Sequence, residues 1–288
     1  MKYTLKKNQI GYYEVFPKPS LDDLKSYYRD TYYQEDSSQY EKFYSNKELE
    51  YFTIEPKITE HIFSKKKYLN KSLLDLGCGE GFFSKFLFDK GWDVQCVDFS
   101  RAGISIHNQN LLKNFTQAEI SEYLLLNSIK GSKYGLINLE NVLEHVIDPV
   151  DLLFNIKPFL GKDSILRIRV PNDFSDFQNY LLSGGHTSET WINPPEHLSY
   201  FNIKSLRNLI SHVGLKIISI QADFAIEQLL LCDHTNYWKD RNLGKYAHSL
   251  RLDCSNYLAA KDIQRYIEYR EAAADLEFGR LLIAFVRI

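Results

Sequence analysis

The chain has 288 residues, of which 35 are basic and 37 acidic, and its formal net charge is −2 at pH 7. A balance this close to neutral provides no broad positive field for a polyanion, so we expect no nucleic-acid partner. Hydrophobic residues make up 44% of the chain, and no stretch approaches the roughly 18 consecutive apolar residues of a membrane span. These properties predict a soluble globular protein without a membrane partner.

The N-terminus and the cysteines predict a cytoplasmic protein. Met1–Asn8 contains lysines with no apolar core behind them, so no secretory signal is expected. The four cysteines lack the Cys-x-x-Cys spacing of a zinc ribbon and the density of a disulfide framework. The oligomeric state is left open by these features.

The first 69 residues are predicted to form a helical cap segment. Ser20–Asp23 has the pattern of a capping box, which predicts a helix over Leu21–Tyr33. A polar loop is expected over residues 34–39. A second helix is predicted over Glu55–Tyr68, with Pro56 tolerated in its first turn.

From residue 70 the pattern changes to apolar strands that alternate with helices. Strands are predicted over Leu73–Leu76, Val94–Asp98, Phe115–Gln117, Gly135–Leu139, Ser164–Val170, Leu215–Gln221 and Gly279–Ile288. Helices are predicted over Phe82–Lys90, Ser100–Leu112, Pro149–Phe159 and Ile203–His212. This alternation predicts an α/β fold, a doubly wound and mostly parallel seven-stranded sheet covered on both faces. A ligand of such a sheet binds at the carboxyl ends of the strands.

Residues 223–276 interrupt this alternation before the last strand. Helical patterning covers Leu258–Leu276, and many polar and aromatic residues fill the rest. An excursion this long in a compact domain is more often a lid or a binding element than an idle loop. We therefore predict a main domain over 70–222 and 277–288, and an insertion over 223–276 that acts as a substrate lid.

A glycine-rich loop follows the first strand of this domain. It has the form Asp75-x-Gly77-x-Gly79-x-Gly81, and Asp98 ends the next strand. Glycines allow a tight turn and a close approach to a ligand, and the later carboxylate can accept the hydroxyls of a ribose. Acidic residues before and within the loop disfavour a pyrophosphate and suit a cationic ligand. The loop therefore predicts a nucleoside site without phosphates.

This spacing resembles the first motif of class I S-adenosylmethionine (SAM) methyltransferases. The resemblance implies a Rossmann-like domain whose last strand is inserted antiparallel, and SAM as the cofactor. It implies that the loop lies under the methionine moiety, that Asp98 holds the ribose, and that Phe99 and residues 117–119 flank the adenine. The residues it implies for cofactor binding are Asp75, Gly77, Cys78, Gly79, Gly81, Phe82, Asp98, Phe99, Ser100, Ala118, Glu119, Glu140 and Asn141.

Two later stretches resemble small-molecule methyltransferases. Asn138–Pro149 is similar to a segment of ubiquinone-pathway O-methyltransferases, and Asn193–Asn202 is similar to the Glu-His-x-x-x-Phe element of bacterial sugar methyltransferases. The resemblance implies O-methylation of a sugar, or of a nucleotide-linked or phosphorylated precursor of a surface glycan or a specialised metabolite. Sugar C-methylation and a non-catalytic SAM-binding subunit are the alternatives. Sugar C-methyltransferases generally carry an N-terminal cysteine-rich zinc module, and here no cysteine precedes Cys78.

The candidate catalytic residues are Glu144, His145 and His197. Two Glu-His pairs, at loops that follow different strands, are expected to converge at one edge of the sheet. A histidine can remove the proton of a hydroxyl acceptor and titrates near pH 6.5 when unperturbed, so His197 or His145 is predicted as a general base. Related enzymes gather Glu-x-x-Glu-His around a divalent ion. Here Asn141 replaces the first glutamate, so a histidine base without a metal is expected. Metal-assisted catalysis at Asn141, Glu144, His145 and His197 is the alternative.

The insertion contains basic residues whose interpretation stays open. Arg241, His248 and Arg251 are suited to an anionic substrate, because arginines bind phosphates and carboxylates well. A solvated helix face is the simpler interpretation of the same residues.

Overall fold

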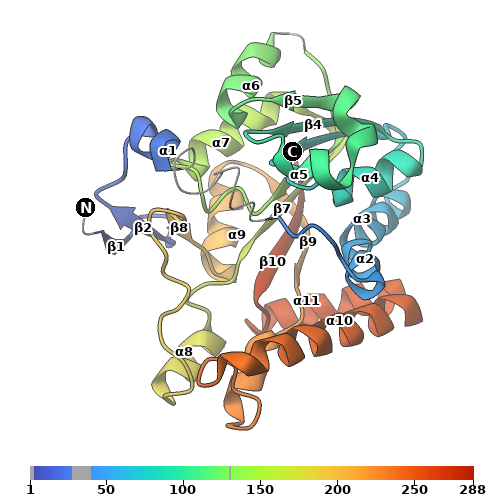
Figure 1. Ribbon diagram of the computed structural model, residues 1–288. Helices are drawn as coiled ribbons and strands as arrows, with labels where there is room; N and C mark the ends of the chain where they lie inside the picture. The colour runs from blue at the N-terminus through green and yellow to red at the C-terminus, as the bar shows by residue number, and fades with distance from the viewer. Residues whose placement is uncertain (1–2, 28–39, 130) are drawn as a thin grey trace.

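A computed structural model describes residues 3–27, 40–129 and 131–288 and contains a central seven-stranded sheet (Figure 1). The strand order is β5-β4-β3-β6-β7-β10-β9, in which β10 runs antiparallel to both of its neighbours. The strands are β3 (Ser72–Leu76), β4 (Asp93–Asp98), β5 (Phe115–Gln117), β6 (Tyr134–Glu140), β7 (Leu160–Pro171), β9 (Lys216–Ala222) and β10 (Leu281–Arg287). The predicted fold class is confirmed, and each of the seven predicted strands is present.

Helices cover both faces of the sheet because its strands are apolar on both. Leu74 and Leu76 belong to one hydrophobic cluster and Leu73 to another, as the alternation of a strand requires. The first face is covered by α6 (Ile120–Ser128), α7 (Pro149–Ile156) and α9 (Ile203–His212). The second face is covered by α3 (Ile54–Lys65), α4 (Phe82–Asp89), α5 (Ala102–His107) and α11 (Ile263–Asp275).

Two predicted helices end earlier than their apolar patterns suggest. The helix expected over Ser100–Leu112 is divided into α5 and a 3-10 helix over Gln109–Asn114. The break falls at Asn108, whose backbone is non-helical and whose side chain donates to the carbonyl oxygen of Glu80 at 2.6 Å. The helix expected over Pro149–Phe159 changes to a 3-10 turn at Lys157–Phe159, where Pro158 lacks the N–H of a continuing α-helix.

The N-terminal segment is only partly helical, which corrects the predicted helical cap. A hairpin of β1 (Thr4–Lys7) and β2 (Tyr13–Phe16) pairs with β8 (Ser199–Tyr200) in a small separate sheet. Helix α1 (Leu21–Tyr27) begins where predicted, whereas the rest of that predicted helix and most of the loop after it lie outside the described residues. A further helix, α2 (Asn46–Phe52), begins with a capping box that the sequence analysis missed.

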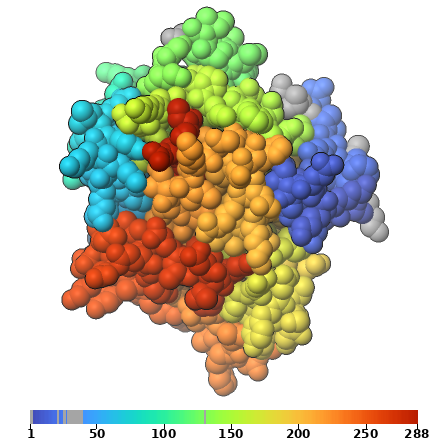
Figure 2. All heavy atoms as spheres, turned by 180° about the vertical axis from the view of Figure 1, so that it is seen from behind, coloured from blue at the N-terminus to red at the C-terminus, as the bar shows by residue number. Residues whose placement is uncertain are grey.

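The insertion at 223–276 consists of two 3-10 turns followed by two long helices. The turns are at Ile226–Leu231 and Arg241–Leu243, and the helices are α10 (Gly244–Lys261) and α11. Seen from behind, α10 and α11 lie beside α3 (Figure 2). Tyr266 and Ile267 of α11 are buried in the same cluster as the sheet. Helix α11 is therefore part of the core. Only the residues of the insertion before α11 are in a position to act as a lid.

Within the described ranges, no helix combines the length and the apolar character that crossing a membrane requires.

One further helix, α8 (Asp176–Ser183), follows β7 and contacts the first turn of the insertion.

A buried ion-pair network joins the sheet to α3 and α11. Arg167, in the middle of β7, is fully buried and donates to Asn138, Glu140 and Glu55, each at 2.7 Å. Glu55 also accepts from Arg270 of α11 at 2.8 Å. No motif in the sequence predicted this network, because its members become neighbours only when α3, β6, β7 and α11 pack together.

The pairing of Glu55 predicts a loss of stability in acid. Burial opposes ionisation of Glu55, but the charges of Arg270 and Arg167 prevail and lower its pKa from 4.5 to about 2. A depressed carboxyl pKa stabilises the fold above the unfolded value, and this stabilisation is lost as the pH falls from 4.5 towards 2. At neutral pH it amounts to about 3 kcal/mol.

Urea unfolding at pH 7 and pH 3 should therefore show a smaller difference for Glu55→Gln than for the wild type. The variant should also be less stable at pH 7, because it leaves two buried arginines short of a partner. Glu268→Gln is the matched control: Glu268 also pairs with an arginine, Arg265, but on the surface, where such pairs contribute little. Equal acid sensitivity in all three proteins would show that Glu55 is not a main source of it.

Candidate active site

The glycine loop between β3 and α4 has the conformation that its sequence requires. Gly77, Gly79 and Gly81 have φ values of 78°, 53° and 78°, a region that disfavours side chains. A Cβ atom at Gly77 would lie 2.4 Å from Cγ2 of Val142, and one at Gly81 would lie 3.2 Å from Ile104. At Gly79 a Cβ atom would meet nothing within 4 Å, so this is where the loop is open to a ligand.

Asp98 lies at the end of β4 directly against the loop. Its carboxylate accepts the backbone N–H groups of Gly79 and Ser100, both at 2.9 Å. Burial raises its pKa, against the effect of these hydrogen bonds. The structure therefore brings the predicted ribose-binding carboxylate, the open glycine and Ser100 together, and the carboxylate retains capacity to accept hydroxyl donors.

Asp75 supports the loop from beneath. It is 1% exposed, and its two oxygens accept from Ser84 at 2.5 Å and from Asn138 at 2.7 Å. Burial raises its pKa to about 6 despite these bonds. Since both oxygens are engaged, Asp75 holds the loop in place. Asn138 also bonds Arg167, so the loop rests on the buried ion-pair network.

Aromatic side chains surround Phe82 at the start of α4, and the sequence analysis singled out Phe82 but none of the others. The ring of Phe82 lies 4.7 Å from that of Phe52 and 5.2 Å from that of His107. The Tyr44 hydroxyl donates to Glu80 at 2.8 Å, and the same carboxylate lies 3.2 Å from His107. This cluster adds the α2 region to the loop wall. It could not be predicted, because it joins parts of the chain far apart in sequence.

The residues predicted to flank the adenine each make different contacts in the structure. Phe99 is 40% exposed beside the loop, and its carbonyl oxygen accepts from the side chain of Gln117 at 3.1 Å. Ala118 bonds the carbonyl oxygen of Asp98 through its N–H at 3.0 Å. The carboxylate of Glu119 caps α6. In the loop itself, the Cys78 thiol lies beside Cys96, and this contact together with burial raises its pKa.

The end of β6 carries a charged pair and a strained residue. Glu140 pairs with Arg167 at 2.7 Å and with Arg169, so its carboxylate is engaged by two cations. These charges lower its pKa although burial acts in the opposite direction. Asn141 has a φ of 53°, which asparagine tolerates better than most residues, and its N–H donates to the carbonyl oxygen of Arg169 at 3.0 Å.

Glu144, His145 and His197 converge, as the sequence predicted. One potential ligand atom of each lies within 4.8 Å of those of the other two. The two imidazole rings are 4.9 Å apart, and His145 bonds the carbonyl oxygen of Glu196 through Nδ1 at 2.7 Å. The backbone carbonyl oxygen of Glu144 accepts from Leu198 at 2.7 Å, which joins the two loops that carry the cluster.

Burial keeps the three side chains of this cluster uncharged near neutral pH. It raises the pKa of Glu144 to about 8. Burial also lowers the pKa of His145. The pKa of His197 is lowered to about 3 by burial first, and then by the electrostatic effects of His145 and Arg280. Oε2 of Glu144 and Nδ1 of His197 are buried without a hydrogen-bond partner among the described residues. Buried polar groups usually have a hydrogen-bond partner, so these two atoms are free to bind a ligand, a water molecule or an ion.

Further acidic groups extend this wall of the site. Asp173, at the end of β7, is 1% exposed and lies 3.2 Å from Arg280, which lies 3.6 Å from Glu227. Burial raises the pKa of Asp173 to about 7. Trp191 is buried among the N-terminal hairpin, Phe174 and Tyr200, so it fixes the loop before His197.

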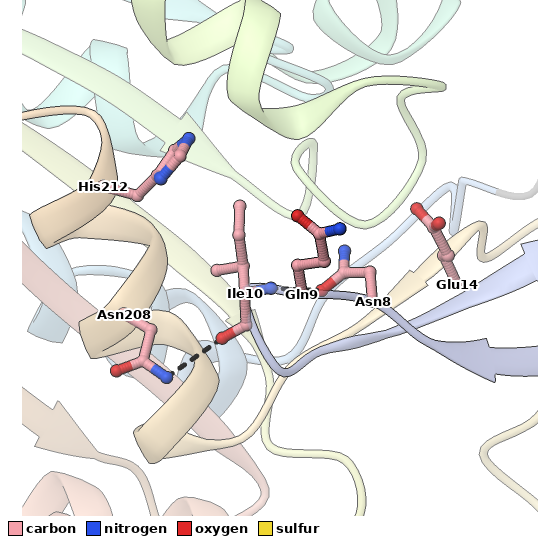
Figure 3. A pocket seen from close by; sticks show the side chains of 6 residues that line it. All are labelled: Asn8, Gln9, Ile10, Glu14, Asn208 and His212. Atoms are coloured by element: carbon pink, nitrogen blue, oxygen red, sulfur yellow. Dashed lines mark hydrogen bonds between the residues drawn. The ribbon is translucent and has the colours of Figure 1, made fainter.

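A separate cavity of about 640 Å³ lies between the N-terminal hairpin and α9 (Figure 3). Its lining comprises Asn8, Gln9, Ile10, Glu14, Asn208 and His212. Figure 3 shows the side chain of Asn208 bonded to the carbonyl oxygen of Ile10, at 2.9 Å. None of the predicted site residues lines this cavity, so it is distinct from the candidate active site.

The strand order, the glycine loop and Asp98 define the class of SAM-dependent methyltransferases with a Rossmann-like domain. The chain belongs to the methyltransferase domain family, which matches residues 46–220, more than half of its length. SAM is therefore its cofactor.

Curated relatives share the central part of the chain. The ubiquinone biosynthesis O-methyltransferase of Haemophilus ducreyi is 27% identical over 155 residues, which are 47% of this chain and 65% of that protein. The protein of the same name from Actinobacillus pleuropneumoniae serotype 7 is 24% identical over 156 residues, which are 48% of this chain and 66% of that protein. The chain thus spans just under two thirds of the length of these relatives.

Solved structures share the fold. Plantazolicin methyltransferase BpumL, in complex with a monoazolic desmethylPZN analog and S-adenosylhomocysteine (SAH), superposes with a TM-score of 0.54 at 19% identity. This match covers 91% of this chain and 92% of that chain. A complex of the same enzyme with a pentazolic analog gives a TM-score of 0.54 at 18% identity, over 91% and 93% of the two chains. The similarity extends over nearly the whole length of both folds.

Proposed function

We propose that the protein transfers a methyl group from SAM to an oxygen atom of a small polar molecule. The observation that carries this proposal is the pairing of two sites at the carboxyl ends of the strands. One is the open loop at Gly79 with Asp98, and the other is the cluster of Glu144, His145 and His197. The names of the curated relatives, ubiquinone biosynthesis O-methyltransferases, support oxygen as the acceptor atom.

The residues around the loop fit SAM. Asp98 has remaining acceptor capacity for the ribose hydroxyls, and Gly79 leaves room beside it. When bound, SAM supplies an electrophilic methyl group on a sulfonium. The surrounding residues orient the acceptor in line with this methyl group and exclude water, which together account for much of the rate enhancement of such a displacement.

We assign His197 as the group that receives the acceptor proton. Its low pKa means that the imidazole is neutral at working pH and ready to accept, although it is a weak base. Proton transfer must then accompany methyl transfer, because the hydroxyl becomes acidic only as its oxygen bonds the methyl carbon. His145 and Glu144 position His197 through their packing in the cluster.

A divalent cation at the same cluster is the second candidate. Neutral imidazoles and a carboxylate oxygen are suitable ligands, and two histidines with a glutamate occur in catalytic zinc sites. The unpartnered Oε2 of Glu144 and Nδ1 of His197 favour this candidate. A bound cation would polarise the acceptor hydroxyl. The neutral side chain at Asn141 disfavours it, since hard cations prefer carboxylates.

For the substrate we propose a sugar, or a nucleotide-linked or phosphorylated precursor of a surface glycan or a specialised metabolite. This rests on the resemblance of residues 193–202 to sugar methyltransferases. We also propose that residues 223–243, the part of the insertion before α10, close over the acceptor. Hydrogen exchange in 223–243 that is unchanged by cofactor and acceptor together would contradict that closure.

The function is tested by incubating the protein with methyl-labelled SAM and pooled polar metabolites. We expect label in an acceptor, with an equal amount of SAH released. Mass spectrometry of the product identifies the methylated atom, and a carbon-bound methyl group would replace O-methylation by C-methylation. SAH binding without methylation of any acceptor would favour a non-catalytic SAM-binding subunit.

A further inference from the structure

Asp173 is a buried carboxylate with only one of its oxygens engaged. It follows β7 by two residues and is 1% exposed. Its Oδ1 accepts from Nη1 of Arg280 at 3.2 Å, whereas its Oδ2 is buried with no hydrogen-bond partner among the described residues. Most buried polar atoms in proteins are paired, so this oxygen has an unused capacity to accept a hydrogen bond.

The backbone around Asp173 fixes the position of its carboxylate. The N–H of Asp173 donates to the carbonyl oxygen of Phe201 at 2.6 Å, and the N–H of Asn172 donates to that of Arg280 at 2.9 Å. Arg280 directly precedes β10, the strand that pairs with β7. Asp173 is therefore anchored on two sides, and its carboxylate is in place before a ligand arrives.

Asp173 lies at the same edge of the sheet as Glu144 and His197. The extended segment Leu198–Phe201 connects them, because its first N–H donates to the carbonyl oxygen of Glu144 at 2.7 Å and its last carbonyl oxygen accepts from Asp173. Four residues in this conformation span at most about 11 Å between their end Cα atoms. Burial raises the pKa of Asp173 to about 7, and the charge of Glu144 acts in the same direction, as expected of neighbouring carboxyl groups.

Three side-chain oxygens after β6 and β7 have no hydrogen-bond partner within the described ranges. They are Oε2 of Glu144, Oδ1 of Asn172 and Oδ2 of Asp173. A hydroxyl or amino group would donate to such oxygens, whereas a carboxylate or a phosphate would bring further acceptors and like charge. Arg280 does not reverse this preference, because its Nη1 lies between two carboxylates, Asp173 at 3.2 Å and Glu227 at 3.6 Å.

Glu227 connects this edge of the sheet to residues 223–243, which we propose to close over the acceptor. It lies in the 3-10 turn Ile226–Leu231 and is 8% exposed. Its Oε1 also lies 3.4 Å from Nε2 of Gln178 in α8. Since Arg280 contacts both Glu227 and Asp173, the turn lies where it can cover a ligand bound at Asp173.

We propose that Asp173 binds a hydroxyl or amino group of the methyl acceptor and so selects acceptors that carry such a group near the methylated oxygen. Oδ2 accepts the hydrogen bond while Arg280 holds Oδ1, and Oε2 of Glu144 offers a second acceptor nearby. A sugar with several hydroxyls has this chemistry, and any phosphate it carries lies away from Asp173. The proposal rests on the proposed function, because it concerns the acceptor of that reaction.

Equilibrium dialysis of the SAH-saturated full chain tests this subsite without requiring methyl transfer. The probe is a pool of free sugars, amino sugars, sugar phosphates and carboxylic acids without hydroxyl groups, and mass spectrometry identifies the compounds that the protein retains. Asp173→Asn keeps the size and an oxygen for Arg280 but places an amide donor where Oδ2 was. Compounds retained by the wild type should therefore bind this variant about tenfold more weakly, as expected for loss of a charged hydrogen bond.

Two readouts separate selection of the acceptor from a purely structural role. Affinity for SAH should be the same in Asp173→Asn and the wild type, and with SAM the variant should raise the KM of a retained acceptor about tenfold while kcat stays close to that of the wild type. Asp176→Asn is the matched control, because Asp176 is an exposed carboxylate three residues further on that lies 3.6 Å from Lys204. It should match the wild type throughout.

Changing the ligand gives the same test without a variant. Analogues of a retained compound, each with one hydroxyl or amino group replaced by hydrogen, are titrated against the SAH-saturated wild type. One of them should bind about tenfold more weakly than the parent compound. That analogue should bind the wild type and Asp173→Asn alike, because it lacks the group that Asp173 recognises. If Asp173→Asn does not fold, the comparison of analogue and parent on the wild type is sufficient.

Equal retention by the wild type and Asp173→Asn, or analogues that all bind as tightly as the parent, would overturn the proposal. A pool from which the wild type retains nothing, or only the carboxylic acids without hydroxyl groups, would overturn it as well. Retained compounds that depend on Asp173 but are not methylated when SAM replaces SAH would instead overturn the proposed function alone.

Discussion

Replacing His197 with asparagine is expected to reduce kcat about a hundredfold or more, which is the size of a general-base contribution. Affinity for SAM should remain close to that of the wild type, because His197 is not among the residues around the glycine loop. Burial lowers its pKa to about 3, so His197 is in its basic form throughout the range from about pH 5 to 8. Protonation of His197 should therefore cause no loss of activity in that range, in contrast to an unperturbed histidine.

The measurement is steady-state kinetics with the acceptor found by the labelling experiment. His212→Asn, at an exposed histidine of α9, is the matched control and should behave as the wild type. A chelator distinguishes the two candidate roles of the cluster: EDTA should leave a histidine base active, whereas a cation site should lose activity and regain it with magnesium, manganese or zinc. Normal turnover by His197→Asn would exclude this residue from both roles.

Replacing Asp98 with alanine is expected to weaken SAM binding at least tenfold. Two hydrogen bonds from ribose hydroxyls to a carboxylate are lost, each of which contributes about 1.5 to 3 kcal/mol. The change also removes the acceptor for the N–H groups of Gly79 and Ser100, so the open part of the loop loses its support. Both effects weaken the binding of SAM.

Calorimetry with SAH measures this loss. Asp93→Ala is the matched control, because Asp93 is an exposed carboxylate at the start of the same strand. Asp98→Asn keeps the size and one acceptor oxygen, so its affinity should fall between those of the wild type and Asp98→Ala. An Asp98→Ala protein that binds SAH as tightly as the control would remove the ribose assignment from the end of β4.

The features that the sequence determined by itself are local. A run of apolar residues, glycines two apart and an acid at the end of the next strand predicted the loop, because backbone conformation and strand direction there depend on adjacent residues. The same reasoning located Asp98, which indeed meets Gly79. The convergence of His145 and His197 was also predicted, since both lie in loops after strands of a sheet whose parallel order the alternation of elements implied.

Tertiary structure decided the features that depend on distant partners. The N-terminal hairpin is stable as strands because β8, far along the chain, supplies its third strand. Arg167 is buried in β7 only because Glu55 and Glu140 from other elements surround it. Likewise α10 is held against α2 by Lys47, which pairs with Asp253 and whose carbonyl oxygen accepts from Asn256. Hydrogen bonds and ion pairs between remote segments leave no periodic trace in a sequence, so the charge and the shape of the site around the loop emerge only on folding.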